Sequence, residues 1–252
     1  MSQERVERFS PEIKTTFADW VKKRGLKVVL FDLDGTLVDT TEVFIRQFDL
    51  FYLYCQEQLP NVDLNKFKSE VVELNDSLFA TMGVSTKKWE HLIDLLSEKH
   101  GVNLSQGLTL FQEIYRTPSR VFDGVKETLE LCREVGLKVG LVTHGIASWT
   151  DEKLRELGFG FDHVNCVDVD EHKHKGPEHW RESVDYFEVS PSEVMVVGDN
   201  LKGDILASHQ IGVKTLVWIP SDWGVYNQGE EVEGIYKIDK IGDLIPTICQ
   251  KK

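Results

Sequence analysis

The sequence contains few cysteines, and this shortage limits the classes of protein to which it can belong. Only four of its 252 residues are Cys. They are Cys55, Cys132, Cys166 and Cys249, and they are scattered without the spacing of a metal site or a redox motif. We therefore expect reduced thiols, as in a cytoplasmic protein, rather than the disulfide framework of a small secreted domain.

Long apolar runs and basic charge are also missing. The first residues, MSQERVERFSPEIK, lack the apolar core of a signal peptide, and no stretch approaches the roughly 18 apolar residues of a membrane span. Lys and Arg number 29 against 42 Asp and Glu, a net charge of −13. This balance argues against nucleic acid or an anionic membrane as a partner. An anionic small substrate stays possible, because a local cation can reverse the field inside a cleft.

The stretch VVLFDLDGTLVDT, from Val28 to Thr40, combines a buried strand with acidic residues. Its apolar run is typical of a strand covered on both faces, as in a parallel sheet. Asp32 and Asp34 follow it, and the two-residue period of a strand points both side chains the same way. Because like charges at short range repel, we expect a bound cation or a raised pKa at this position.

The sequence predicts helices on both sides of this strand, and those that follow it form a separate domain. A helix is predicted from Pro11 to Gly25, capped by Ser10. Residues 40–118 have helical periodicity and many aromatics, with no convincing strand. We therefore expect a helical cap domain over 40–118, inserted into a core domain that comprises 1–39 and 119–252. The hinges would lie near Val38–Thr41 and Thr117–Arg120.

Strands and helices alternate from Gly124 onward. The pattern predicts strands at 137–145, 163–169, 194–200 and 214–219, separated by helices at 124–136, 148–157, 178–187 and 203–212, with a final strand and helix within 233–248. Such alternation predicts βαβ units, and so a Rossmann-like parallel sheet between two helical layers, a three-layer α/β/α core. Residues 220–234 are expected to form an irregular surface loop.

Oxygen-rich side chains follow several of the predicted strands. Besides Asp32 and Asp34, Thr143 ends the second strand, and Asp199 follows a later one with Asp204 at a helix start. Ligands in open parallel sheets bind beyond the carboxyl ends of the strands, where these side chains would meet. Oxygen ligands suit a hard cation, and Mg²⁺ commonly bridges carboxylates to phosphate.

These residues carry a resemblance to a known family. DLDGTLVDT, LVTHG, Lys175 before Gly-Pro, and VVGDNLKGD are similar to the four ordered motifs of the haloacid dehalogenase (HAD) superfamily, in its phosphatase branch. The similarity extends from Lys27 to the C-terminus and includes a type 1 helical cap between the first two motifs, as in phosphoglycolate phosphatase and β-phosphoglucomutase. One departure is Gly176, where relatives often have Pro directly after the Lys.

The resemblance implies a Mg²⁺-dependent phosphatase of small phosphorylated metabolites. Asp32 would be the nucleophile that forms an aspartyl-phosphate, and Asp34 the general acid and base.

The family pattern also implies ligands for the metal and the phosphate. The metal would be held by Asp32, the backbone carbonyl of Asp34, and Asp199, with Asp204 acting directly or through Lys175. Thr143 and Lys175 would hold the phosphoryl oxygens, and His144 would offer its backbone N–H.

Each assignment has a simpler alternative. Asp204 could be only a helix N-cap, and Lys173 competes with Lys175. His172, His174 and His179 could form a transition-metal site, but their acidic, lysine-rich loop favours solvated positions at the rim.

The function and the cap residues also have alternatives. Trp89 and Tyr115 could line the substrate space or simply pack the cap. The alternative functions are a phosphomutase of the same family and, in another class, a phosphoacceptor or binding module.

Overall fold

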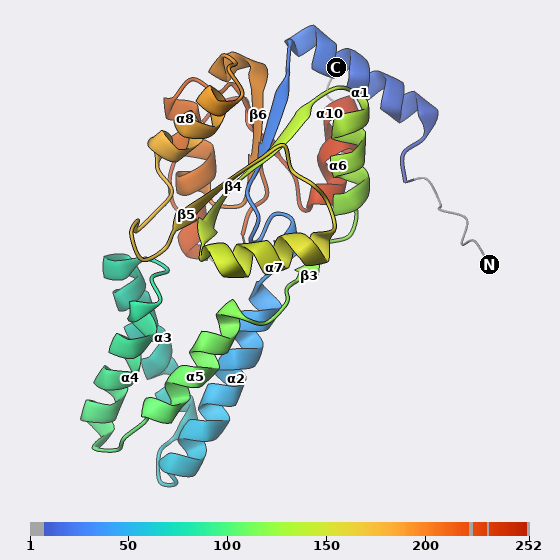
Figure 1. Ribbon diagram of the computed structural model, residues 1–252. Helices are drawn as coiled ribbons and strands as arrows, with labels where there is room; N and C mark the ends of the chain where they lie inside the picture. The colour runs from blue at the N-terminus through green and yellow to red at the C-terminus, as the bar shows by residue number, and fades with distance from the viewer. Residues whose placement is uncertain (1–7, 222–223, 231, 251–252) are drawn as a thin grey trace, which may run out of the picture.

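A parallel sheet covered by helices on both faces forms the larger part of the molecule (Figure 1). The computed structural model describes residues 8–221, 224–230 and 232–250. The six strands are β1 (Val28–Phe31), β4 (Lys138–Gly145), β5 (His163–Asp168), β6 (Val194–Gly198), β7 (Thr215–Trp218) and β8 (Tyr236–Lys237). They pair in the order β5-β4-β1-β6-β7-β8, and every pairing is parallel. The predicted three-layer α/β fold is therefore confirmed.

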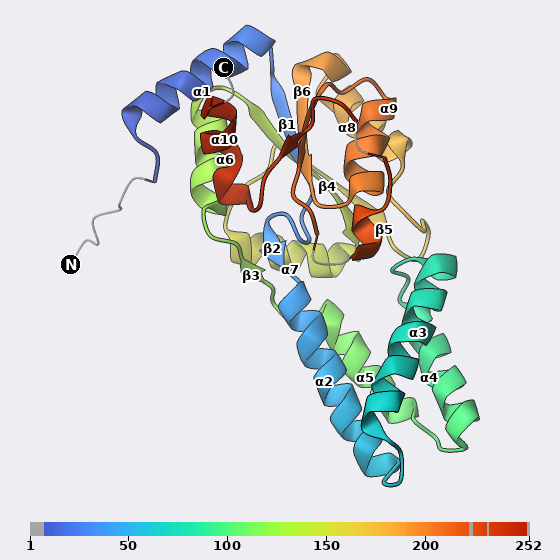
Figure 2. The ribbon, with the colours of Figure 1, turned by 180° about the vertical axis from the view of Figure 1, so that it is seen from behind.

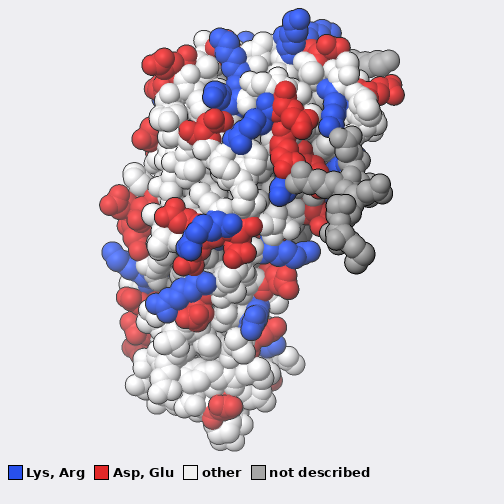
Figure 3. All heavy atoms as spheres, turned by 45° about the vertical axis from the view of Figure 1, so that its right-hand side comes forward, with Lys and Arg blue, Asp and Glu red and all other residues white. Residues whose placement is uncertain are grey.

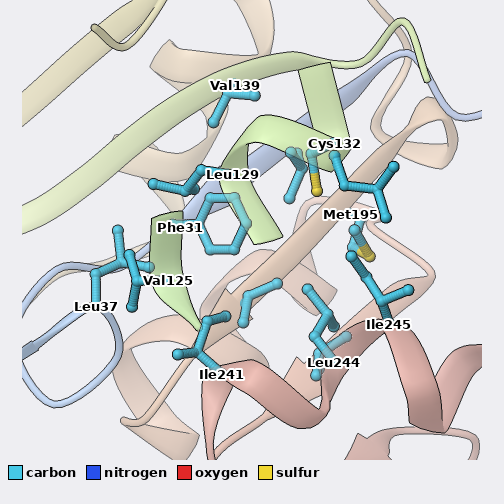
Figure 4. Packing of buried hydrophobic residues seen from close by; sticks show 14 of the residues in the cluster. Phe31, Leu37, Val125, Leu129, Cys132, Val139, Met195, Ile241, Leu244 and Ile245 are labelled. Carbon is cyan, nitrogen blue, oxygen red and sulfur yellow. The ribbon is translucent and has the colours of Figure 1, made fainter. Parts of the chain in front are cut away.

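Successive residues of β1 pack on opposite faces of the sheet, as the two-residue period of a strand requires. Val29 and Phe31 belong to the hydrophobic cluster beneath three helices, α1 (Pro11–Arg24), α6 (Val125–Glu134) and α10 (Leu244–Gln250). Figure 4 shows Phe31 among side chains of α6 and α10. Val28 and Leu30 belong to the cluster on the other face. The central strand is therefore buried on both sides, which explains its continuous apolar sequence.

The opposite face of the sheet is covered by α8 (Pro177–Tyr186), α9 (Ala207–Gln210) and the π-helix η4 (Leu201–Leu206). Trp180 of α8 is fully buried there, and its indole N–H donates to the Gly203 carbonyl at 2.7 Å. Another helix, α7 (Ala147–Leu157), follows β4, and a short 3₁₀ helix, η3 (Pro191–Glu193), leads into β6. Two further 3₁₀ helices, η5 (Gly224–Asn227) and η6 (Ile241–Asp243), flank β8 in the chain.

The helical segment after β1 extends away from the sheet (Figures 1 and 2). It contains α2 (Thr41–Gln58), α3 (Leu64–Met82), α4 (Lys87–His100), η1 (Ser105–Gly107), α5 (Leu108–Gln112) and η2 (Glu113–Tyr115). Its aromatic residues form a second hydrophobic cluster, in which Phe51 and Phe111 are fully buried. The last part of this region, residues 105–115, consists of two 3₁₀ turns around one short α-helix.

The two connections between sheet and helical segment pair with each other. β2 (Val38–Asp39) and β3 (Arg120–Val121) form a short antiparallel ladder, which sequence analysis did not predict. The Arg120 guanidinium also donates to the Asp39 carboxylate at 2.9 Å. Each connection supplies only two residues to the ladder, too few to show the alternation of a strand in the sequence. The chain thus crosses between the two parts at one tied position.

The surface and the cysteines have simple descriptions. Figure 3 shows basic and acidic side chains interspersed over the visible face, without a continuous basic patch among its coloured residues. Within the described part of the chain, no helix is both long and apolar enough to cross a bilayer. All four cysteines are free thiols, and Cys55 and Cys132 are buried.

Candidate active site

The carboxyl ends of β1 and β6 bring three buried carboxylates together. Asp32 directly follows β1, and its backbone N–H donates to the Val197 carbonyl of β6 at 2.9 Å, which extends the ladder by one residue. Asp199 follows β6, and Asp204 lies in the π-helix beyond it. Carboxylate oxygens of Asp32, Asp199 and Asp204 lie within 4.8 Å of one another, and all three residues are at most 4% exposed.

The π-helix is what directs Asp204 back toward the strand ends. Backbone N–H groups of Asp204 and Ile205 both reach the Asn200 carbonyl, at 2.8 and 3.4 Å, and the longer bond opens the turn. The Asp204 carboxylate in turn accepts from the Asn200 N–H at 3.0 Å. Gly198 makes this approach possible, since a Cβ there would overlap the Asp204 carboxylate. The prediction of an ordinary α-helix over 203–212 is therefore wrong in its first turn, which belongs to the π-helix.

The turn after Asp34 depends on a glycine. Gly35 has a φ of +80°, and a Cβ at this position would overlap the Asp199 carboxylate. Only glycine adopts this conformation without strain and leaves room for the second acidic strand end. The DGT sequence is thus explained by close packing of the two loops.

Lys175 compensates part of the buried negative charge. Its Nζ lies in contact with the Asp32 carboxylate, 2.7 Å from Asp204 Oδ1 and 3.2 Å from the Val142 carbonyl. Burial alone would lower the pKa of Lys175, but the carboxylates of Asp204 and Asp32 outweigh it and raise that pKa above its ordinary value. Lys173 instead donates to the Ala80 carbonyl of α3, so the structure places Lys175, and not Lys173, in the cluster.

Lys175 does not fully compensate the carboxylates, and the pKa values of Asp32 and Asp199 are raised. Burial raises the pKa of Asp32 to about 7, with Lys175 opposing the shift and Asp204 adding to it. Burial, and then the charges of Asp32 and Asp204, raise the pKa of Asp199 well above its usual range. Groups with these environments bind a cation readily, because the cation removes the repulsion that burial strengthens.

Asp34 has a different partner, Lys153 of α7, which sequence analysis missed. The Lys153 side chain is 1% exposed, and its ammonium contacts the Asp34 carboxylate and lies over the Trp149 ring. Burial lowers the pKa of Lys153, and the Asp34 charge opposes the shift. Asp34 itself keeps 26% of its side chain exposed. It is therefore the more accessible of the two carboxylates that follow β1.

Thr143 and His144 lie on β4 beside the carboxylate cluster. The Thr143 hydroxyl is buried and has no hydrogen-bond partner among the described residues. Such an orphaned hydroxyl suits a ligand oxygen. Burial lowers the pKa of His144 to about 4, so its imidazole is neutral, and the Nε2–H can donate to the His172 carbonyl at 2.7 Å.

The histidine-rich loop does not form a metal site. His172 and His174 are exposed, as expected of rim residues, but His179 is buried, which corrects that expectation. The His179 Nδ1 accepts from the Gly176 N–H at 2.9 Å, because the ring caps the start of α8. Within the described ranges, the candidate metal cluster contains only aspartates.

The oxygen donors fit a magnesium ion. Each of the three buried aspartates offers one carboxylate oxygen to a common position, and hard divalent cations prefer this donor type. The four carboxylates of the site face two ammonium groups, so a charge of −2 remains when all six groups are ionised. One divalent cation would neutralise this remainder.

The cluster opens into a cavity of about 150 Å³ between the sheet and the helical segment. Asp32, Asp34 and Asp199 line one side, and Phe48, Trp89 and Tyr115 line the other. The volume admits on the order of ten water molecules, and therefore a small metabolite. Tyr226 of η5 also reaches the cavity, so part of the segment 220–234, expected to be a surface loop, contributes to the site; residues 222–223 and 231 of it lie outside the description.

The helical segment is held against the sheet above this cavity. Asp170, in the loop after β5, accepts from the Ser85 hydroxyl at 2.7 Å and from the Thr86 hydroxyl and N–H at 2.6 and 2.9 Å. These bonds lower the pKa of Asp170, although burial opposes the shift. Figures 1 and 2 show the turn between α3 and α4 beside this loop.

A parallel α/β core with an acidic, metal-compatible cluster at its strand ends and an inserted helical segment defines a class of hydrolytic enzymes. The model of the haloacid dehalogenase-like hydrolases matches residues 26–212, most of the chain. The protein belongs to this family of hydrolases.

Curated relatives cover most of the chain. Glyceraldehyde 3-phosphate phosphatase of Pyrococcus furiosus is 27% identical over 218 residues, 85% of this chain and 87% of that protein. Pyrophosphatase PpaX of Bacillus velezensis is 28% identical over 229 residues, 88% of this chain and 96% of that protein.

Solved structures share the fold at lower identity. A haloacid dehalogenase-like family hydrolase from Xanthomonas campestris has a TM-score of 0.69 at 16% identity, covering 88% of this chain and 94% of the other. The HAD-hydrolase YfnB from Bacillus subtilis has a TM-score of 0.65 at 16% identity, covering 88% and 98%. These likenesses confirm the fold.

Proposed function

We propose that the protein is a magnesium-dependent phosphatase of small phosphorylated metabolites and that it works through an aspartyl-phosphate on Asp32. The observation that carries the proposal is the convergence of Asp32, Asp34 and Lys175 with two further carboxylates beside a cavity between the sheet and the helical segment. Two relatives of this chain are named as phosphatases of small phosphorylated compounds, which supports the same reaction class.

The two carboxylates after β1 would divide the chemistry. A carboxylate oxygen of Asp32 attacks phosphorus while the bond from phosphorus to the leaving oxygen breaks. Asp34, the more accessible carboxylate, gives its proton to that leaving oxygen. It then takes a proton from the water that attacks the aspartyl-phosphate and restores Asp32. Asp34 is suited to both steps because it lies at the cavity and outside the buried cluster.

The other residues would hold the phosphoryl group. Lys175 and the orphaned hydroxyl of Thr143 would donate to its oxygens, and His144 would add its backbone N–H. Asp32, the Asp34 carbonyl and Asp199 would hold Mg²⁺, with Asp204 as a further ligand or as the group that orients Lys175. When bound, the ion would neutralise phosphate charge that the carboxylates otherwise repel.

We further propose that residues 40–118 act as a cap over the core formed by 1–39 and 119–252. The paired linkers β2 and β3 tie the cap to one side, and the hydrogen bonds to Asp170 hold it at the other. Such a cap excludes water from the leaving group and must open to release product.

The test is a panel of phosphate esters assayed for free phosphate with Mg²⁺, with excess chelator, and with Mg²⁺ restored. We expect release that stops with chelator and returns with the ion. Full activity in chelator, with no metal recovered from the protein, would contradict the metal assignment. Isomerisation without phosphate release would indicate a phosphomutase, and a stable phosphoprotein without turnover a phosphoacceptor.

A further inference from the structure

Lys88 of α4 is a buried cation on the helical side of the cavity. The residue is 4% exposed, although it lies at the second position of its helix, where lysine is normally solvated. It lines the same cavity as Asp32 and Asp34. Burial lowers its pKa to about 8, and the nearby charge of Asp76 opposes the shift. Its ammonium is therefore still mostly protonated at neutral pH.

The surroundings of Lys88 satisfy only part of its ammonium group. Nζ donates to Asn75 Oδ1 at 2.9 Å and lies 4.0 Å from the Trp89 ring centroid and 5.6 Å from that of Phe79. An ammonium has three donors, and a neutral amide satisfies one of them. Within the described residues, no carboxylate lies within ion-pair distance of Nζ; Asp76 is exposed. A buried charge of this kind calls for an anion.

The other lysines that line the cavity already have partners. Lys175 is held between Asp32 and Asp204, and the exposed Lys173 donates to the Ala80 carbonyl. Among the described lysines of the cavity, Lys88 is thus the buried one that no carboxylate contacts. The α3–α4 turn beside it is fixed to the sheet by Asp170, so the ammonium stays above the cavity.

We propose that Lys88 forms an anion subsite for the leaving group, and that the preferred substrates are monophosphate esters whose leaving group carries a carboxylate. The inference rests on the proposed phosphatase function and adds its substrate class. The phosphate would occupy the aspartate cluster, and the carboxylate at the far end of the ester would accept hydrogen bonds from Lys88. Asn75 would hold the ammonium in place, and the aromatic rings between the two ends would cover the apolar body of the ester.

A matched pair of esters isolates the charge. 4-Carboxyphenyl phosphate and 4-carbamoylphenyl phosphate have nearly the same shape, and only the first is anionic at its far end. The ratio of their kcat/KM values would be measured for the wild type, Lys88→Met, Lys88→Arg and the exposed neighbour variant Lys87→Met. Comparing ratios between variants cancels the difference in leaving-group reactivity.

We expect Lys88→Met to lower the carboxylate-to-amide ratio by about tenfold or more, because the net contribution of one hydrogen bond between charged groups corresponds to at least about a tenfold change in affinity. Lys88→Arg should retain most of the ratio, and Lys87→Met should leave it within about twofold, as for surface substitutions away from a site. A change of less than about threefold in Lys88→Met would overturn the subsite.

Two controls separate the subsite from the phosphatase function and from folding. If the wild type releases no phosphate from 4-nitrophenyl phosphate, the proposed function fails, and the subsite with it. If it cleaves 4-nitrophenyl phosphate but the carboxylate-to-amide ratio of kcat/KM does not change in Lys88→Met, only the subsite fails. Should Lys88→Met not fold, 4-hydroxybenzoate must inhibit the wild type more strongly than 4-hydroxybenzamide. Equal inhibition would overturn the proposal.

Discussion

The buried lysines on the two sides of the cavity have different partners. On the sheet side, Lys175 contacts Asp32 and Asp204, and Lys153 contacts Asp34. On the helical side, Lys88 has one amide and two aromatic rings. Charges on the sheet side are therefore organised around each other before any ligand arrives, as chemistry common to all substrates requires. Under our proposal, the charge on the helical side would contact the part of the substrate that differs between esters.

The largest effect should come from the sheet side. We expect Asp32→Asn to lower kcat by at least about 10³-fold for every ester, since removing a nucleophile leaves only binding and electrostatic contributions. Circular dichroism should show a folded protein, and Asp185→Asn on the exposed part of α8 serves as the matched control. A variant that kept more than about a tenth of the wild-type rate would show that Asp32 is not the nucleophile.

Lys153 should affect the sheet side more selectively. Lys153→Met keeps the side-chain stem but removes the ammonium that contacts Asp34. Asp34, the proposed acid for the leaving group, would then be held less firmly in position. We expect kcat/KM to fall by about 10²-fold for alkyl phosphates, whose leaving group needs the proton, because general acid catalysis contributes about 10²–10⁴-fold. The loss should be much smaller for 4-nitrophenyl phosphate, whose leaving group departs without protonation.

The same panel of esters tests the role of Lys153. Lys153→Arg should recover part of the loss, because it restores the cation beside Asp34. Equal losses on alkyl and nitrophenyl esters would mean that Lys153 only supports packing.

Much of the fold was predictable because buried positions carry apolar residues, and their spacing in the sequence indicates the type of element. β1 is apolar at every position since helices cover both of its faces; β6 likewise has no polar side chain, and β7 has only one, the buried Thr215. The ladder of β2 and β3 was not predictable, because two residues per strand carry no period. The π-helix depends on hydrogen bonds of Asn200 and Asp204, which become visible only when the strand ends meet.

The site was predictable where it follows the strands. Asp32 and Asp34 follow β1, Asp199 follows β6, and Thr143 lies two residues before the end of β4, so the structure brings them to one edge of the sheet; their catalytic roles stay predictions. Tyr226 could not be predicted, because its contact with the cavity depends on how an irregular segment packs.

Lys153 and Lys88 left a signal that was overlooked. Lys153 falls four residues from Trp149 and from Leu157 on the buried stripe of α7, and all three are buried. Lys88 falls four residues before the buried Leu92 of α4. A lysine in an apolar stripe at helical spacing indicates a buried charge that needs a partner. Sequence alone could not say that one partner is Asp34 and that the other is missing.

The cost of the buried charge on the helical side can be measured as stability. In the folded protein burial holds the pKa of Lys88 at about 8, against 10.5 for an ordinary lysine. Below pH 8 the folded state keeps the ammonium at a cost, and above about 10.5 neither state carries it. The free energy of unfolding should therefore rise between these values, by up to about 3 kcal/mol.

Lys88→Met removes this dependence. The variant should be more stable than the wild type at pH 7 by about 2 kcal/mol, and the difference should shrink as the pH approaches 10. Denaturant titrations at a series of pH values measure the difference, and Lys87→Met should change stability by less than about 0.5 kcal/mol. A wild type more stable than Lys88→Met at pH 7 would mean that Lys88 has a compensating anion within the protein.

The smallest effects should come from the aromatic lining, and their pattern matters more than their size. The Trp89 indole N–H donates to the Tyr115 hydroxyl at 2.7 Å, and the Trp89 ring stacks on Phe111 with centroids 4.6 Å apart. Tyr115→Phe removes the hydroxyl that accepts from Trp89 and keeps the ring. Trp89→Phe puts a smaller ring in the lining of the cavity. We expect kcat/KM to change by about threefold to tenfold, in a different order for different esters, because each contact touches only some leaving groups.

Asp34→Asn, measured on the same esters, provides the contrast, since it should lower all alkyl phosphates together. If Tyr115→Phe and Trp89→Phe also lowered every ester equally, both aromatics would belong to the packing of the helical segment rather than to substrate recognition. If replacing residues 40–118 with the corresponding segment of a relative left the ranking of esters unchanged, the helical side would have no part in selecting the substrate. The selectivity would then have to come from the sheet side, where Tyr226 and His144 also line the cavity.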